Sequence, residues 1–226
     1  MINADIVKLR NIDDEDIGDL LPKIEKSYHF RFHKTDLIDV KTFGELCDII
    51  VNKIQLPQLD DCTSQQAFYK LRAAICNSLG FTKENIHLTT ELALLFPWVK
   101  RRENIKLVEN MLGFPLNILR PKYWLTTSLA LLFLTSFFCF FFNWQFGLGL
   151  LMLSIGGFYL SHKFGKDLDI ATIRELVEKM SREHYLDSRR DAGTVNKKEV
   201  VKKITNLFAS DLDLDHAVLT RDAAFN

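Results

Sequence analysis

The sequence predicts an all-α protein that combines one or two small helical bundles with a two-helix transmembrane hairpin. The segment from Tyr123 to Ser161 contains no Asp, Glu, Lys or Arg, whereas the flanking parts are charged and place apolar residues at helical spacing. The whole chain has 29 Lys+Arg and 29 Asp+Glu, a formal net charge of +0. This balance argues against a nucleic-acid partner, because binding to phosphates normally needs a basic excess.

Two helices are predicted before residue 56. The first has a helical apolar stripe formed by Leu20, Leu21, Ile24 and Tyr28. Because proline is tolerated in the first turn of a helix, Pro22 indicates that this helix begins near Asp19. The second helix follows Thr42, which forms a T-x-x-E capping box with Glu45. Its inward face is formed by Phe43, Leu46 and Ile50.

Two further helices are predicted before the uncharged segment. The first covers 64–79 with Thr63 or Ser64 as N-cap, and its stripe consists of Phe68, Leu71, Ile75 and Leu79. The second covers 102–112 and ends at Gly113, a helix stop signal. Its stripe consists of Ile105, Val108 and Leu112.

The uncharged segment is too long for one membrane span. As a single helix it would measure roughly 58 Å, against a bilayer core of about 30 Å. The cluster 143–145, Asn-Trp-Gln, divides it into spans at Tyr123–Phe142 and Phe146–Ser161, and the second can extend to Phe164 while Lys163 reaches the headgroups. The hairpin therefore covers 123–164. The alternative is a buried helical hairpin in the core of a soluble protein.

Basic residues flank both ends of this hairpin. Arg120 and Lys122 precede it, and Lys163 and Lys166 follow it. By the positive-inside rule, both termini are expected on the cytoplasmic side of a multi-pass protein of the cytoplasmic (inner) membrane. No signal peptide is expected, because Met1 is followed by neither a cationic nor an apolar stretch.

The chain after the hairpin repeats patterns that occur before it. Residues 167–176 resemble 36–46, and both contain a capping box, here Thr172 with Glu175. The last helix opens near Thr194, with a stripe of Val200, Ile204, Leu207 and Phe208. The loop after it, 212–224, resembles 79–93 in an alignment that pairs Leu219 with Leu88. Two separate similarities indicate an internal repeat.

The order of these helices resembles that of an acyl carrier protein. The segment from His29 to Ile50, HFRFHKTDLIDVKTFGELCDII, is similar to the end of carrier helix II, the next loop and helix III. Val200–Phe225 is similar to carrier helix I and its loop. In the middle of the chain, carrier helices I, II and III would correspond to Ser64–Leu79, Arg102–Leu112 and Thr172–Met180.

The resemblance implies two carrier-like units. The first comprises 1–56 (helices II and III), completed by 195–226 (helix I) from the same chain or from a swapped partner. The second comprises 62–118 plus 167–182, interrupted by the hairpin. An incomplete bundle would leave its apolar stripe in water, at about 25 cal/mol per Å².

The residue that gives carriers their chemistry is missing. A carrier attaches phosphopantetheine to the serine of an Asp-Ser-Leu motif. The matching place in the first unit is Asp13-Asp14-Glu15, with Asp14 at the serine position, and the second unit has no serine between Leu79 and Thr127. We therefore expect no phosphopantetheine, no other cofactor, and no catalytic, cofactor-binding or metal-binding residues.

Other reactive residues do not form a recognisable site. His29 and His33 have helical spacing but lack a third metal ligand, and the acidic run Asp13–Asp16 suits the start of a helix. Cys47, Cys62, Cys76 and Cys139 lack metal-ligand spacing, so we expect free thiols in a reducing cytosol. The sequence 100–102, Lys-Arg-Arg, either contacts anionic lipid headgroups or forms a solvated helix start.

The expected function is that of a membrane-anchored, non-catalytic carrier-like docking or scaffold protein. One alternative is an accessory subunit or small enzyme of lipid or acyl metabolism. Another is a structural membrane protein that self-associates through its spans, where Gly147, Gly149, Gly156 and Gly157 permit close helix approach. The expected partners are the lipid bilayer and acyl-metabolism enzymes or acylated carriers, no nucleic acid is expected, and a homo-oligomer is left open.

Overall fold

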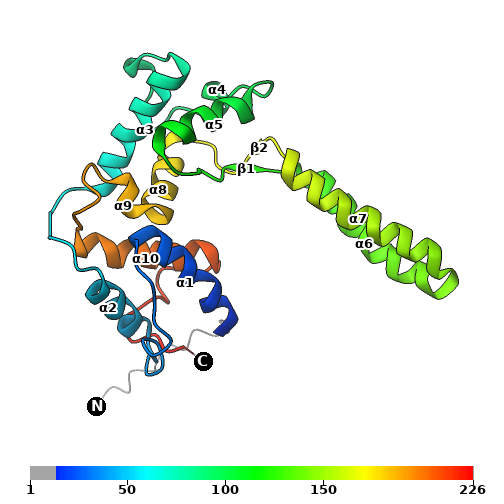
Figure 1. Cartoon of the computed structure of the whole chain (residues 1–226), viewed down its shortest axis with the longest axis horizontal. Helices are drawn as coiled ribbons and strands as arrows, with labels where there is room; N and C mark the ends of the chain where they lie inside the picture. Colours follow the sequence, from blue (N-terminus) through cyan, green and yellow to red (C-terminus); the bar gives the residue numbers. More distant parts are fainter. Residues whose placement is uncertain (1–13, 226) are drawn as a thin grey trace. The chain divides into compact units, whose positions relative to one another are not determined.

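The computed structural model describes residues 14–225 and confirms the all-α prediction (Figure 1). The described helices and strands are α1 (Asp14–Tyr28), α2 (Phe43–Lys53), α3 (Thr63–Leu79), the 3-10 helix η1 (Lys83–Asn85), α4 (Leu92–Leu95), α5 (Arg101–Leu112), β1 (Leu119–Arg120), α6 (Tyr123–Phe142), α7 (Trp144–Phe164), β2 (Asp167–Leu168), α8 (Ile173–Glu183), α9 (Tyr185–Ser188) and α10 (Lys197–Asp211). The only sheet in this range is the two-stranded pair β1–β2.

The chain divides into two compact units. Unit 1 contains the described residues up to Leu88 and those from Arg174 onward, and unit 2 contains Thr89–Ile173. Unit 1 therefore holds α1, α2, α3, η1, α9, α10 and all of α8 except its first residue, whereas unit 2 holds α4, α5, the β1–β2 pair and the helical pair α6–α7. The carrier-like domain boundaries predicted from the sequence stay a prediction.

The hydrophobic core of unit 1 brings the first and last helices of the chain together. α10 packs against α1 and α2. The rings of Phe43 in α2 and Phe208 in α10 meet edge to face, with centroids 5.1 Å apart. The fully buried residues from these three helices include Leu20, Ile24, Leu46, Ile50, Val200, Ile204 and Phe208. Their spacing of three and four residues explains why each segment is helical.

α1 differs from the prediction that placed its start near Asp19. The helix begins at Asp14, so Pro22 lies inside it rather than in its first turn. Proline in this position removes one backbone hydrogen bond and crowds the carbonyl of residue 18. The helix nevertheless continues, because Leu20, Ile24 and Tyr28 on both sides of the proline are buried in the core.

The helix-capping predictions have mixed outcomes. At α2 the capping box is confirmed, since Thr42 Oγ1 accepts from Glu45 N and Glu45 Oε2 accepts from Thr42 N. The N-cap predicted for α3 is wrong, because Cys62 holds that position without a side-chain cap. The amide of Thr63 instead donates to Glu199 Oε2 of α10 at 3.0 Å, so a distant helix supplies the acceptor.

A buried polar cluster joins distant parts of unit 1 around Arg189. The residue is 1% exposed. Its guanidinium donates to Thr63 Oγ1 at 2.7 Å and to the carbonyl oxygen of Leu59 at 3.2 Å, while its Nε donates to Thr194 Oγ1 at 3.3 Å. Because a buried guanidinium is stable only when its donors are satisfied, these contacts fix the 59–63 and 189–194 segments together.

The same backbone arrangement occurs at the start of α2 and at the start of α8. The bonds at α2 are Phe43 N to Ala223 O (2.9 Å), Gly44 N to Arg221 O (2.9 Å) and Phe225 N to Lys41 O (3.0 Å). The bonds at α8 are Ile173 N to Thr90 O (3.0 Å), Arg174 N to Leu88 O (2.9 Å) and Leu92 N to Ala171 O (2.8 Å). Isolated bridges, Thr42 with Ala224 and Thr172 with Glu91, complete the two sets.

In unit 2, α6 and α7 form an antiparallel helical hairpin in which the helices run side by side (Figure 1). The turn is shorter than predicted, because α7 already begins at Trp144. Asn143 alone separates the helices, and its Oδ1 accepts from Gln145 N and Phe146 N at 3.0 and 3.3 Å. A single residue suffices because this side chain caps the new helix directly.

Both helices are long and apolar enough to span a membrane. The most apolar windows of α6 and α7 are only 6% and 17% buried. A helical hairpin in the core of a soluble protein would instead be covered by other elements. The apolar surface of these helices is therefore left for lipid or another apolar environment.

Small residues form the contact between α6 and α7. Ser136 of α6 and Gly147, Ser154 and Ser161 of α7 are buried, and the last three recur at heptad spacing. A Cβ atom on Gly147 would lie 2.9 Å from the backbone nitrogen of Phe140, so glycine permits this close approach. Gly149 and Gly156, in contrast, face open space.

Candidate functional site at the base of the hairpin

The two ends of the hairpin are joined by the β1–β2 pair. Leu119 pairs with Leu168 and Arg120 with Asp167, in antiparallel register. The amide of Asp169 also donates to the carbonyl oxygen of Ile118 at 2.9 Å. Since backbone pairing of this kind holds neighbouring strands about 5 Å apart, the chain enters and leaves the hairpin at the same place.

Arg101 anchors α5 to this base. Its side chain is buried, its Nε donates to the carbonyl oxygen of Phe96 at 2.8 Å, and its Nη1 donates to that of Lys166 at 2.8 Å. Arg102 Nη1 donates to the carbonyl oxygen of Gly165 at 3.2 Å. The sequence 100–102 was expected either to contact lipid headgroups or to form a solvated helix start. Arg101 does neither, because its side chain is buried and bonded to backbone carbonyl oxygens.

Gly165 is required where the chain leaves the hairpin. A Cβ atom there would lie 2.6 Å from the carbonyl carbon and oxygen of Arg120 and from the nitrogen of Pro121. Because these are backbone atoms, they cannot move aside without disturbing the β1–β2 pair.

Replacing Gly165 by alanine is expected to destabilise unit 2 by about 1–3 kcal/mol, because the added methyl group overpacks this junction. Hydrogen exchange of the Asp169 amide, which donates to Ile118 O, reports the disturbance directly. Gly149→Ala is the matched control, since a Cβ atom there meets nothing within 4 Å. Equal exchange of this amide in the two variants would contradict the expectation.

A groove of about 340 Å³ lies at the base of the hairpin, between the start of α6 and the end of α7. We call it the hairpin-base groove. It is lined by Trp98, Pro121, Lys122, Leu125, Leu129, Gly157, Leu160, Ser161, Phe164, Gly165 and Lys166. The ammonium group of Lys122 lies 4.9 Å from the centre of the Trp98 ring, in a cation–π contact. The groove thus combines apolar walls with two lysines.

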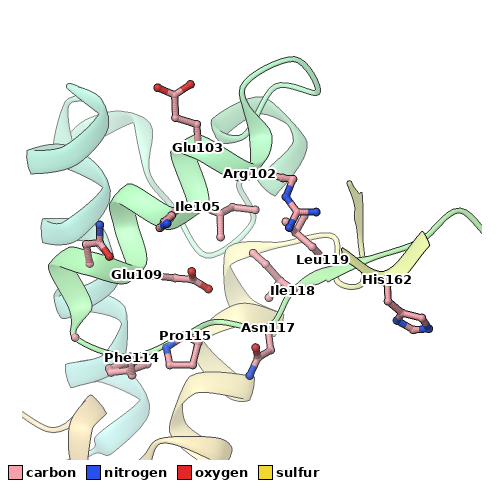
Figure 2. Close-up of a pocket in the computed structure, with 13 residues that line it drawn as sticks. Arg102, Glu103, Ile105, Glu109, Phe114, Pro115, Asn117, Ile118, Leu119 and His162 are labelled. Atoms are coloured by element: carbon pink, nitrogen blue, oxygen red, sulfur yellow. The ribbon is translucent and has the colours of Figure 1, made fainter. Parts of the chain in front are cut away.

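A larger open groove of about 990 Å³ follows α5 and the loop after it (Figure 2). Figure 2 shows Arg102, Glu103 and Glu109 projecting from α5, with His162 of α7 on the other side. Glu109 is engaged, since its Oε1 accepts from the amide of Leu116 at 2.7 Å. The lining carries both charge signs and contains no cysteine or serine.

The structure does not bring the predicted reactive residues together. His29 Nε2 lies 3.2 Å from Asp187 Oδ1, in an ion pair when the histidine is protonated. No group of three or more His, Cys, Asp or Glu side chains among the described residues could hold a metal ion. Asp13 of the acidic run and the Met1 segment lie outside the described residues. The side chain of Asp14 is not described either.

The cysteines are free thiols in the structure. Cys47 is buried, and burial raises the pKa of its thiol to about 12. Such a thiol is not nucleophilic near neutral pH. Cys62 is exposed and is therefore the accessible thiol in the loop before α3.

Burial also lowers the pKa of Lys203 in α10, whose ammonium group donates to Ser64 Oγ at 2.8 Å and Ser181 Oγ at 2.7 Å. These hydroxyl partners assign Lys203 a role in joining α10 to α3 and α8 within unit 1.

Sequence reasoning missed Gly165 and Trp98 as parts of the base, and it noted Lys166 only as a charge that follows the hairpin. Gly165 follows the last residue of α7, and a glycine after a helix is an ordinary stop signal. The residue types of Trp98 and Lys166 were nevertheless a signal, since aromatic and basic residues are typical of the ends of membrane spans. Trp98 was not recognised because it precedes the hairpin by more than twenty residues in the sequence.

Comparisons with known protein families, with curated proteins and with solved structures find no match to this chain.

Proposed function

We propose that this chain is a membrane-anchored, non-catalytic docking protein with two carrier-like helical units on the cytoplasmic side of the membrane. The hairpin of α6 and α7 is the anchor. The helices around it present surfaces for partner proteins of acyl metabolism, and the missing serine leaves the units without a phosphopantetheine arm.

The observation that carries the proposal is the recurrence of one backbone arrangement at α2 and α8. Three hydrogen bonds and one bridge appear in both places, and each set ties the start of a helix to a loop that follows another long helix, α10 or α3. The left-handed residues after these long helices, Gly80 and Asp213, also correspond. This supports an internal repeat of the carrier-like plan, one copy of which contains the hairpin.

The geometry at the base supports placing both flanks on one side of the membrane. The β1–β2 pair holds Arg120 and Asp167 opposite each other, at the two ends of the hairpin. The turn at Asn143 has no charged neighbours between Tyr123 and Ser161. Because basic residues cluster at the base and not at the turn, the positive-inside rule favours a cytoplasmic base.

Cysteine labelling in intact cells is expected to place both flanks in one compartment. Cys62, which is exposed, reports on the part before the hairpin, and Ala192→Cys in a Cys62→Ser chain reports on the part after it. Both thiols should resist a membrane-impermeant maleimide until the cells are opened. Gln145→Cys in the same background marks the turn and should react from outside. The proposed arrangement would be wrong if Cys62 and the thiol introduced by Ala192→Cys reacted from opposite sides of the membrane.

Proximity labelling from the full chain in its native cell tests the docking role. Enrichment of enzymes or carriers of acyl metabolism is expected. Leu107 and Met111 of α5 are exposed, lie one turn apart and make an apolar face, so Leu107→Ser/Met111→Ser should reduce this enrichment. Ile38→Ser is the control, since Ile38 is exposed in a loop of unit 1. Labelling of other copies of this chain alone would favour self-association instead.

A further inference from the structure

The hairpin-base groove lies between the ends of the two long apolar helices. Its walls come from the first turns of α6 and the last turns of α7, including Leu125, Leu129 and Leu160. These helices expose apolar side chains along their length. The groove is thus continuous with the surface that an acyl chain would cover if the hairpin is inserted in a bilayer.

The depth of the groove agrees with the interface between headgroups and acyl chains. Tyr123 and Trp124 at the start of α6 and Tyr159 near the end of α7 are all exposed. Aromatic side chains of this kind are typical of the interfacial layer of a membrane protein. Trp98 lies at the same level as Lys122, because the ammonium group of Lys122 rests on its ring.

The cations of the groove are Lys122 and Lys166, and its eleven lining residues include no Asp or Glu. None of the neighbouring arginines lines the groove: Arg101 and Arg102 donate to backbone carbonyl oxygens, and Arg120 pairs with Asp169. The positive charge in the wall of the groove therefore comes from the two lysines. A phosphate is the lipid group that such a pair of ammonium groups attracts.

We propose that the hairpin-base groove binds one anionic phospholipid. Its phosphate is held by Lys122 and Lys166, and the first part of one acyl chain lies against Leu125, Leu129 and Leu160 beside Trp98. The volume of about 340 Å³ is at the lower end of ligand pockets, so the groove takes part of the lipid while the rest stays in the bilayer. This inference rests on the proposed membrane anchoring.

Binding of lipid to the purified full chain tests the site. In native mass spectrometry from detergent, one phosphatidylglycerol per chain is expected to be retained in preference to phosphatidylcholine with the same acyl chains. Lys122→Gln and Lys166→Gln should each weaken retention by about fivefold, the effect of removing one cation near an anionic surface. Neither change should alter folding, because Lys122 is exposed and Lys166 contacts Arg101 through its backbone carbonyl oxygen.

Lys163→Gln is the matched control. Lys163 lies at the same end of α7 but outside the groove, over the rings of Tyr159 and Phe164. Retention should be unchanged in this variant. An equal loss for all three lysines would indicate general attraction to an anionic surface and would overturn the site. Glycerol phosphate, which lacks acyl chains, should not compete, and competition by it would assign the groove to a soluble phosphate compound.

A second measurement reports on the apolar wall. In a Trp124→Phe/Trp144→Phe chain, Trp98 is the remaining tryptophan. Phosphatidylglycerol with brominated acyl chains should quench it more than brominated phosphatidylcholine at equal mole fraction. Equal quenching by both lipids leaves the anchoring intact and rejects the anionic site. No quenching by either lipid, with the chain recovered in the aqueous phase, rejects the anchoring itself.

Discussion

Replacing Phe208 by alanine is expected to destabilise unit 1 by about 3–5 kcal/mol, the usual cost of removing a fully buried aromatic side chain. Phe208 is 0% exposed and meets Phe43 of α2 at a centroid distance of 5.1 Å. The change therefore leaves a cavity at the centre of the α1–α2–α10 core. Hydrogen exchange of the Ile54 amide, which donates to Ile50 O at the end of α2, measures the loss in the full chain.

Lys202→Ala is the matched control, because Lys202 is an exposed residue of the same helix. It should leave exchange in α2 within about 0.5 kcal/mol of the parent chain. Deletion of residues 195–226 removes the whole of α10 and should unfold the part of the chain before residue 56. A truncated chain that keeps α1 and α2 cooperatively folded and monomeric would show that α10 does not complete this core.

Replacing Arg189 by methionine is expected to cost unit 1 about 3 kcal/mol, although a methionine side chain fills much of the same space. The guanidinium satisfies Thr63 Oγ1, Leu59 O and Thr194 Oγ1 in a site that is 1% exposed. Without it, buried acceptors lose their donor, and each such loss costs about 1–3 kcal/mol. Chemical denaturation of the purified full chain, followed by circular dichroism, measures the change.

The adjacent arginine provides the control for this prediction. Arg190 is exposed, and its hydrogen bond to Gln66 Oε1 comes from its backbone nitrogen, so Arg190→Met should be close to neutral. Two arginines next to each other in the sequence should thus differ by several-fold in their effect on stability. Similar behaviour of the two variants would mean that the buried hydrogen bonds around Arg189 contribute little.

Local patterns predicted the elements whose causes are local. The charge-free run gave the two long apolar helices, and the T-x-x-E sequence gave the capping box between Thr42 and Glu45. The end of α5 at Gly113 was also predicted, because its φ of 85° is one that glycine adopts without strain. In each case the residues that decide the structure lie within one or two helical turns.

Predictions failed where a distant residue decides the outcome. The first turn of α3 has a partner in Glu199, far along the chain, so Thr63 is freed from capping and accepts from Arg189. α1 tolerates Pro22 because tertiary packing outweighs the lost hydrogen bond. The predicted similarity of 212–224 to 79–93 paired Leu219 with Leu88, whereas in the two backbone arrangements Leu88 O takes the place of Arg221 O.

The candidate site was less predictable than the fold. The basic residues Lys122 and Lys166 were noted only as flanking charge, and the hairpin-base groove needs Trp98 as a third contributor. No sequence pattern predicts the contact between Trp98 and Lys122. The contact depends on the position of the segment before α5, which Arg101 ties to the base through its bond to the carbonyl oxygen of Lys166. A site assembled from three separate segments is visible only once those segments are folded.

The strand pair at the base makes the α6–α7 hairpin a removable module. Arg120 and Asp167 lie directly opposite each other in antiparallel register, which is the geometry that a tight two-residue reverse turn closes. Exchanging residues 121–166 for Asn-Gly would therefore join β1 to β2 as a short β-hairpin. Such a shortened chain would lack the exposed apolar surface of α6 and α7, which should make the remaining helices easier to crystallise or to study in solution.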